Sequence, residues 1–184
     1  MTDDSFFRLA ADCDAARAAA ERLFQTVTDQ LHPQLPMSAE IRHVGATAIP
    51  GCLTKGDLDM VVRVARADFA AADERLARLF ARNVGSIRTD AFSAFADASR
   101  TPHLGVQLTV KGGTLDVFHH FADALRSDPA LVERYNALKR AHQDWPMALY
   151  RPAKDAFIAG VLRERSLRSR GQSGLTSIQS APSS

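Results

Sequence analysis

The feature that most constrains the fold of this chain is a short, nearly continuous apolar run, Leu58–Val64. A run of this length suits a strand better than a helix. Met60, Val61, Val62 and Val64 leave few polar positions in it, as expected for a strand in the interior of a sheet. The run therefore predicts a central strand, and we expect other segments of the chain to pack around it.

Three further segments are predicted to be strands. Ile41–Val44 is a short apolar segment before a glycine turn, and His103–Val110 alternates apolar and polar side chains, which gives a strand two unlike faces. A Lys-Gly-Gly sequence at 111–113 predicts a hairpin turn, because glycine tolerates positive φ, and Thr114–Phe118 is then the returning strand. The stretch 86–101 stays ambiguous between a short strand and a loop.

Helices account for most of the remaining chain. Apolar residues at spacings of three and four predict one long amphipathic helix over residues 5–31 and a second over 67–82. Asp128 followed by Pro129 predicts a helix start, because aspartate caps a helix and proline suits its first position. Pro152 opens a final predicted helix. The pattern predicts an α+β fold, with helices packed on a small sheet.

The composition fits one folded body, predicted to span residues 1–165. A chain of 184 residues buries about 70% of its surface on folding, so it can form a core without disulfides. Residues 166–184 are rich in serine and glycine and lack periodicity, which predicts a disordered tail.

Charge and hydropathy exclude several classes of partner. The net charge of +2 argues against a dedicated nucleic-acid-binding protein, which usually has a strongly basic face. No apolar run approaches the roughly 18 residues of a membrane span. The two cysteines, Cys13 and Cys52, are too few for a disulfide framework. We therefore expect a cytoplasmic protein with no membrane partner, and its oligomeric state stays open.

The residues with the clearest chemical signal are Asp57 and Asp59. Side chains two positions apart on a strand point to the same face, so the two like charges repel each other. A divalent cation offsets such repulsion, and hard oxygen ligands suit Mg²⁺ or Mn²⁺. A solvated strand end is the alternative explanation for the same pattern.

Two other segments are candidates for the same site. Gly45, Ala46 and Thr47 form a turn after a strand, where backbone N–H groups, with the Thr47 hydroxyl, are able to approach a phosphate. An ordinary glycine turn is the alternative. Asp116 is an acid in an otherwise apolar segment, where burial without a partner is costly. It either completes a cluster of three carboxylates or pairs with an arginine at the sheet edge.

The order of glycine turn, Asp-x-Asp and later aspartate resembles the nucleotidyltransferase superfamily that includes DNA polymerase beta and the aminoglycoside nucleotidyltransferases. A closer resemblance is to the GrpB-like family. It is carried by the turn His43–Gly51 with Lys55–Asp59, and downstream by Leu125–Pro129, Tyr135 with Leu138 and Lys139, and Tyr150 with Lys154.

The resemblance implies a nucleotidyltransferase-like fold: a mixed, mainly antiparallel sheet with helices on one side. It implies that Asp57, Asp59 and Asp116 are the catalytic and metal-binding residues, with an NTP as substrate. The groups expected to contact the triphosphate are Gly45, Ala46, Thr47, Lys55, Arg42, Lys139, Lys154 and Tyr135. Arg126 and His43 are weaker candidates.

Three functions remain open at this point. The first is transfer of a nucleotidyl group from an NTP to an unknown acceptor, with Mg²⁺ or Mn²⁺. The second is a non-catalytic nucleotide- or coenzyme-binding domain of the same fold, which Ala46 favours because serine is usual there in the family. The third is a structural or interaction domain with a vestigial pocket.

Overall fold

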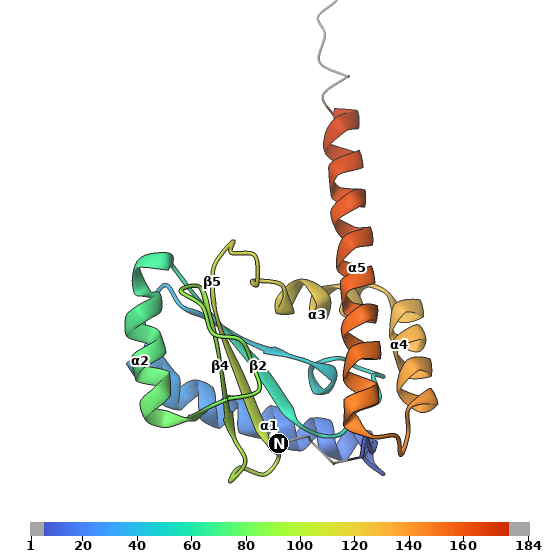
Figure 1. Ribbon diagram of the computed structural model, residues 1–184, viewed down its shortest axis with the longest axis horizontal. Helices are drawn as coiled ribbons and strands as arrows, with labels where there is room; N and C mark the ends of the chain where they lie inside the picture. The colour runs from blue at the N-terminus through green and yellow to red at the C-terminus, as the bar shows by residue number, and fades with distance from the viewer. Residues whose placement is uncertain (1–5, 177–184) are drawn as a thin grey trace, which may run out of the picture.

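The computed structural model of this protein describes residues 6–176, with side chains through residue 167. Five strands form one sheet in the order β1-β2-β5-β4-β3 (Figure 1). Only β2 and β5 are parallel, and the other pairs are antiparallel. The strands are β1 (Glu40–Val44), β2 (Leu58–Val64), β3 (Ala81–Arg82), β4 (Phe92–Asp97) and β5 (Leu104–Val110). The predicted α+β class and the mixed, mainly antiparallel sheet are confirmed.

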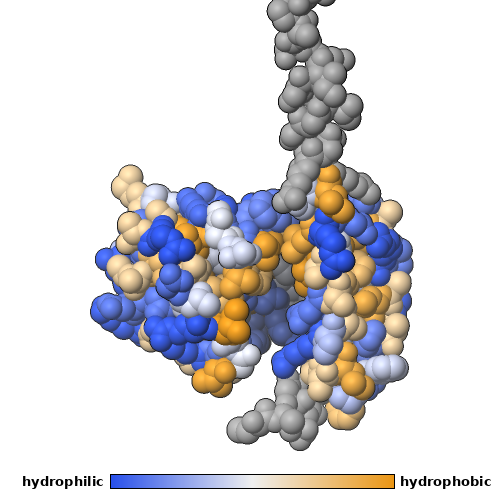
Figure 2. Space-filling model, turned by 45° about the horizontal axis from the view of Figure 1, so that its top comes forward, coloured by the Kyte–Doolittle hydropathy of each residue, from blue (hydrophilic) through white to orange (hydrophobic). Residues whose placement is uncertain are grey.

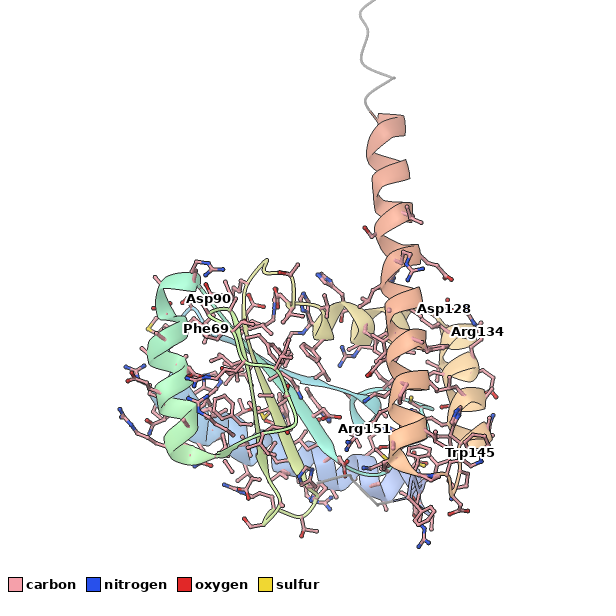
Figure 3. The ribbon with its side chains drawn as sticks, viewed as in Figure 1. Phe69, Asp90, Asp128, Arg134, Trp145 and Arg151 are labelled. Atoms are coloured by element: carbon pink, nitrogen blue, oxygen red, sulfur yellow. The ribbon has the colours of Figure 1, made fainter. Side chains whose placement is uncertain are left out.

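The helices lie on both faces of this sheet, so the expectation of helices on one side is wrong. Leu58, Met60, Val62 and Val64 of β2 pack with α1 and α2, and Val61 packs on the other face with α3, α4 and α5. In Figure 3, Phe69 of α2 lies on the side of the helix toward the sheet. The helices are α1 (Cys13–Leu31), α2 (Phe69–Leu79), α3 (Phe118–Ser127), α4 (Pro129–Ala141) and α5 (Met147–Thr176), with 3-10 turns η1 (His32–Gln34), η2 (Ala46–Ala48) and η3 (Arg66–Asp68).

The predicted hairpin after β5 is wrong. Turns follow Val110, and helix α3 starts at Phe118, so Thr114–Phe118 contains no returning strand. The strand was predicted only as the continuation of a hairpin turn at 111–113, whereas the helical spacing of Phe121, Ala122 and Leu125 places three buried side chains on one face. Burying that face against the sheet decides the outcome.

The N-terminal helix is shorter than predicted. Helix α1 begins at Cys13, where Asp12 caps it by accepting from the N–H groups of Asp14 and Ala15. The preceding residues run alongside the start of α5 instead, with Phe7 N donating to the Trp145 carbonyl at 2.7 Å. The ambiguous stretch 86–101 contains strand β4.

The other helix ends show one agreement and one difference. Asp128 caps α4 as predicted, and its carboxylate accepts from Leu131 N at 3.0 Å. Helix α5 continues past residue 165, where the sequence predicts a tail, to Thr176, and residues 177–184 lie outside the described residues. Within residues 6–176, no helix is long and apolar enough to cross a membrane.

Candidate functional site

Asp57 and Asp59 lie at the start of β2, on the face of the sheet that is turned toward α5. The alternation of a strand directs both side chains to the same face. The register places Val44 of β1 and Gly105 of β5 directly beside Asp59. Lys154 of α5 acts electrostatically on the Asp59 carboxylate, so this end of β2 faces α5.

The Asp59 carboxylate is desolvated and, among the described side chains, lacks a direct partner. Within the described part of the chain it has neither a hydrogen bond nor an ion pair. Desolvation by the surrounding protein raises the pKa of Asp59 from 3.8 to about 6, and the charge of Asp57 adds to the rise, although Lys154 opposes it. A half-buried acid without a partner is costly to ionise, and such groups gather at functional sites.

Two glycines leave room for this carboxylate. A Cβ at Gly45 would lie 2.6 Å from Asp59 Oδ2, and a Cβ at Gly105 would lie 3.0 Å from Asp59 Oδ1. Gly45 also has a φ of +73°, which other residues rarely adopt. The glycine of the predicted turn is therefore needed for the close approach of the chain to Asp59.

Side chains of α1 and α4 hold the loop that leads into β2. Arg17 donates to the carbonyls of Ile49 and Cys52 at 3.1 and 3.0 Å. Asn136 donates to the Gly51 carbonyl at 2.9 Å and accepts from Leu53 N at 2.8 Å. The loop is thus fixed on two sides immediately before the two aspartates.

Lys139 and Tyr135, two of the predicted binding residues, are buried and engaged elsewhere. Lys139 Nζ donates to the Leu53 carbonyl and to Cys52 Sγ, and lies 3.9 Å from the centroid of the Tyr135 ring. Burial lowers the pKa of Lys139. Its side chain is only 2% exposed, so it supports the loop and is not free to meet a phosphate.

Thr47 is also engaged. Its hydroxyl donates to the Asp57 carbonyl at 2.9 Å and lies 3.0 Å from His43 Nε2, while His43 Nδ1 lies 3.0 Å from Glu21 Oε2. Thr47 is 1% exposed. Its hydroxyl therefore holds the backbone at Asp57 and does not point to solvent.

Asp116 lies apart from the two aspartates of β2. Arg63 donates to its two oxygens at 2.7 and 2.6 Å, and Thr109 Oγ1 donates at 3.0 Å. Although burial opposes it, these bonds lower the pKa of Asp116 to about 2. Arg63 and Thr109 are register partners four positions beyond Asp59, about 13 Å along the strand. Of the two predicted alternatives, the structure shows pairing with an arginine.

The remaining basic candidates divide between the site and the sheet edge. Arg42 pairs with Asp123 of α3 at 2.7 Å, away from the aspartates. Lys55 Nζ lies 3.1 Å from Asp57 Oδ2 on the accessible side of the site. Lys154 exerts the largest charge–charge effect on Asp59. Lys55 and Lys154 are thus the two predicted cations that the structure brings to the aspartates.

Three residues near the site are absent from the predicted set. Gly105 and Gln107 share the Asp59 face of the sheet, and His103 acts electrostatically on Asp59. Gln107 Oε1 is buried and, among the described residues, has no hydrogen-bond partner. The signal for both β5 residues was their place on the polar face of an alternating strand, but only the register shows that this face adjoins Asp59.

Asp57 and Asp59 are the two carboxylates that the site offers to a cation. Over the described residues, no group of three His, Cys, Asp or Glu side chains is arranged to hold a metal ion. Mg²⁺ is often bound by one or two carboxylates, with phosphate oxygens and water as the other ligands. Asp57 and Asp59 match this mode of binding, and the uncompensated Asp59 carboxylate favours a cation.

The surface of the molecule has a hollow between two lobes. Figure 2 shows the molecule hollowed between the lobe of the sheet and α2 and the lobe of α4 and α5. A ligand that enters between the lobes meets the sheet on one side and α5 on the other.

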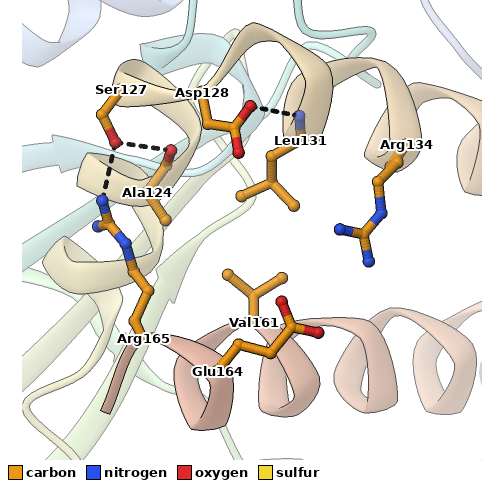
Figure 4. Close-up of a pocket in the computed structure, with 8 residues that line it drawn as sticks. All are labelled: Ala124, Ser127, Asp128, Leu131, Arg134, Val161, Glu164 and Arg165. Carbon is orange, nitrogen blue, oxygen red and sulfur yellow. Dashed lines mark hydrogen bonds between the residues drawn. The ribbon is translucent and has the colours of Figure 1, made fainter. Parts of the chain in front are cut away.

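Two separate cavities lie elsewhere. One of about 240 Å³ lies between α3, α4 and α5, where the polar groups of Ser127, Asp128 and Arg165 are already hydrogen-bonded (Figure 4). The other, of about 580 Å³, lies between the loop at Ile49 and helices α3 and α4. Neither includes Asp57 or Asp59.

Known proteins resemble this chain over most of its length. A family model described as GrpB protein matches residues 14–164. The UPF0157 protein VC_A0354 of Vibrio cholerae is 33% identical over 150 residues, which cover 81% of this chain and 79% of that protein. The crystal structure of the conserved protein GrpB from Enterococcus faecalis covers 79% of this chain and 92% of that chain, with a TM-score of 0.60 and 20% identity. A Cid1 poly(U) polymerase structure bound to MgATP covers 71% of this chain and 41% of that chain, with a TM-score of 0.43 and 13% identity. The family match and the Vibrio relative show that this chain belongs to the GrpB family.

Proposed function

We propose that this protein is a metal-dependent nucleotidyltransferase that uses an NTP, with its site at the start of β2. The observation that carries the proposal is the Asp59 carboxylate, which is half-buried and unpaired within residues 6–176, and lies beside Asp57 and against the Gly45 turn. A fold that needed this position only for packing would place an apolar residue there, because an unpaired buried acid costs stability.

Asp57 and Asp59 are the proposed ligands of one Mg²⁺ ion. When bound, the ion neutralises triphosphate charge and lowers the pKa of an acceptor hydroxyl. Lys55 and Lys154 approach the same carboxylates and add positive charge for the phosphates. The backbone N–H groups of Gly45 and Ala46 are proposed to approach the phosphates. The fixed loop before Asp57 keeps the two carboxylates in place.

Asp116 has no part in this proposal, because its carboxylate is fully used by Arg63, Thr109 and Gly112. The site therefore offers two carboxylates, which favours a single bound metal ion. The acceptor stays unassigned.

Isothermal titration with ATP, GTP, CTP and UTP in the presence of Mg²⁺ tests the proposal. We expect at least one NTP to bind wild type and to lose measurable affinity with Asp59→Asn. Asp90→Asn is the matched control, because Asp90 is exposed and pairs only with Arg66 at the surface. Failure of all four nucleotides to bind wild type refutes the proposal.

A non-catalytic nucleotide- or coenzyme-binding domain is the second candidate. Two observations favour it: Ala46 removes the hydroxyl that serine supplies in the family turn, and Asp116 is absent from the site. Pyrophosphate release separates the two functions. An NTP that binds tightly but yields no pyrophosphate with any acceptor pool points to the binding domain.

A further inference from the structure

A chain of polar side chains lies behind the aspartates, with His43 and Thr47 buried and Glu21 partly exposed. The contacts run from Glu21 of α1 through His43 of β1 to Thr47 of η2. Glu21 Oε2 lies 3.0 Å from His43 Nδ1, and His43 Nε2 lies 3.0 Å from Thr47 Oγ1. The Thr47 hydroxyl then donates to the Asp57 carbonyl at 2.9 Å. Side chains of α1, β1 and η2 thus converge on the backbone of one aspartate.

The chain has the order acid, histidine and hydroxyl, which in hydrolases activates a nucleophile. Burial excludes that role here. Thr47 is 1% exposed and its proton is directed at a backbone carbonyl. No substrate reaches the Thr47 hydroxyl, so these three side chains hold the protein backbone at Asp57.

The orientation of His43 is fixed from several sides. Its ring stacks on Phe24, with centroids 5.2 Å apart, and its carbonyl accepts from Arg126 Nη2 at 3.0 Å. His43 is 8% exposed. Burial lowers the pKa of His43, although Glu21 opposes the change, and the tautomer of the ring decides which nitrogen donates in its contacts with Glu21 and Thr47.

The three side chains hold the backbone immediately before β2. Asp57 precedes the first residue of the strand, so its carbonyl is not secured by the strand itself. Movement of this peptide unit would shift the Asp57 carboxylate relative to Asp59. Groups that orient metal ligands from behind change metal affinity by about 10- to 100-fold when they are removed.

We propose that His43 and Thr47 are positioning residues for the metal site, with Glu21 orienting His43 and Thr47 holding the Asp57 backbone at the spacing from Asp59 that a divalent cation requires. The inference rests on the proposed function, since it assigns these residues to the same metal site. It predicts that a hydroxyl at position 47 matters for the metal although no metal touches it.

The test measures Mn²⁺ affinity by isothermal titration for Thr47→Val, Thr47→Ser and wild type. We expect Thr47→Val to weaken Mn²⁺ binding by about tenfold, and Thr47→Ser to remain within about twofold because it restores the hydroxyl. The matched control is Thr109→Val, a buried threonine on the Asp59 face of the sheet whose hydroxyl donates to Asp116. Equal affinity for Thr47→Val and wild type, or an equal loss in Thr109→Val, overturns the inference.

A double-mutant cycle tests whether His43 acts through Thr47. The variant His43→Gln combined with Thr47→Val is expected to lose no more affinity than the weaker-binding single variant, because both remove the same support. If the loss of Mn²⁺ affinity in the double variant equals the product of the two single losses, His43 and Thr47 act separately. That result contradicts the proposal that His43 acts through Thr47. If Thr47→Val does not fold, Glu21→Ala at the half-exposed end of the chain gives the same readout, with a smaller expected loss of about threefold.

A metal-free measurement separates the two proposals. Carboxyl ¹³C resonances followed against pH report the apparent pKa of Asp59 without any ligand. A Thr47→Val variant that leaves the Asp57 and Asp59 carboxyl resonances unchanged overturns the inference, whether or not wild type binds Mn²⁺. If wild type binds no Mn²⁺ but these resonances shift in Thr47→Val, the proposed function fails and the positioning of the aspartates stands.

Discussion

Replacing Asp59 by asparagine should stabilise the metal-free protein at neutral pH. The pKa of Asp59 is raised from 3.8 to about 6, so between these values the folded state binds a proton that the unfolded state has lost. Stability therefore falls as pH rises from about 4 to 6 and stays reduced above that range. Two units of pKa at 1.36 kcal/mol each correspond to about 3 kcal/mol, and Asp59→Asn removes this cost.

Denaturant unfolding in EDTA at pH 7.5 and pH 4 measures the effect. At pH 7.5 a gain of about 3 kcal/mol corresponds to a rise in Tm of about 6–12 °C for a chain of this size. At pH 4 the two proteins should differ little, because Asp59 is protonated in the folded state. The control Asp57→Asn removes a partly exposed charge that is paired with Lys55 and should change stability by less than about 1 kcal/mol.

Magnesium should largely cancel this difference in stability. At a concentration 100 times its Kd, a ligand that binds only the folded state adds about 2.7 kcal/mol, and only wild type should gain it. An Asp59→Asn variant that is no more stable than wild type at pH 7.5, or that gains equally at pH 4, refutes the reasoning about an uncompensated carboxylate.

Three further perturbations have defined outcomes. Gly45→Ala places a methyl group 2.6 Å from Asp59 Oδ2 at a φ of +73°, so it should destabilise the fold by about 1–3 kcal/mol in a thermal melt and abolish Mg²⁺ stabilisation; a variant as stable as wild type contradicts the close approach. Asp116→Asn breaks the pair with Arg63. Because the pKa of Asp116 is lowered to about 2, its contribution of about 2 kcal/mol is present above pH 4 and is lost as pH falls toward 2, so acid unfolding should become shallower in the variant while the Mg²⁺ affinity of the folded protein stays the same. Lys139→Met removes a buried ammonium group together with its hydrogen bond to the Leu53 carbonyl. It should reduce NTP affinity only by making Asp57 and Asp59 more mobile, and hydrogen exchange in residues 51–57 should rise. Unchanged exchange contradicts a role for Lys139 in holding the loop.

The strand β2 shows what local pattern is able to predict. Its bounds, Leu58–Val64, agree with the sequence prediction, because a short apolar run between polar residues has few other stable conformations. The cap at Asp128 is equally local: one side chain and the N–H group three residues later define it.

Asp116 shows what local pattern does not predict. The segment that contains it follows a Lys-Gly-Gly sequence typical of a hairpin turn, and its observed conformation depends on the burial of α3 against the sheet. Asp116 either joins the metal site or pairs with an arginine, depending on whether Asp59 or Arg63 of β2 lies near it. Only the register of the sheet shows which of the two is near. Thr47 and Lys139 were predicted to contact the triphosphate. Their side chains instead donate to the Asp57 carbonyl and to Cys52 Sγ, contacts that depend on the tertiary structure.

The direct test of the account is a crystal of this protein grown with Mn²⁺ and a non-hydrolysable NTP. Anomalous scattering locates the metal independently of any assumption about its ligands. We expect a peak about 2 Å from carboxylate oxygens of Asp57 and Asp59, with the triphosphate between the Gly45 turn and Lys154, and no peak at Asp116. A nucleotide bound elsewhere with no metal at Asp59, or the same peak in Asp59→Asn crystals, contradicts the central claim.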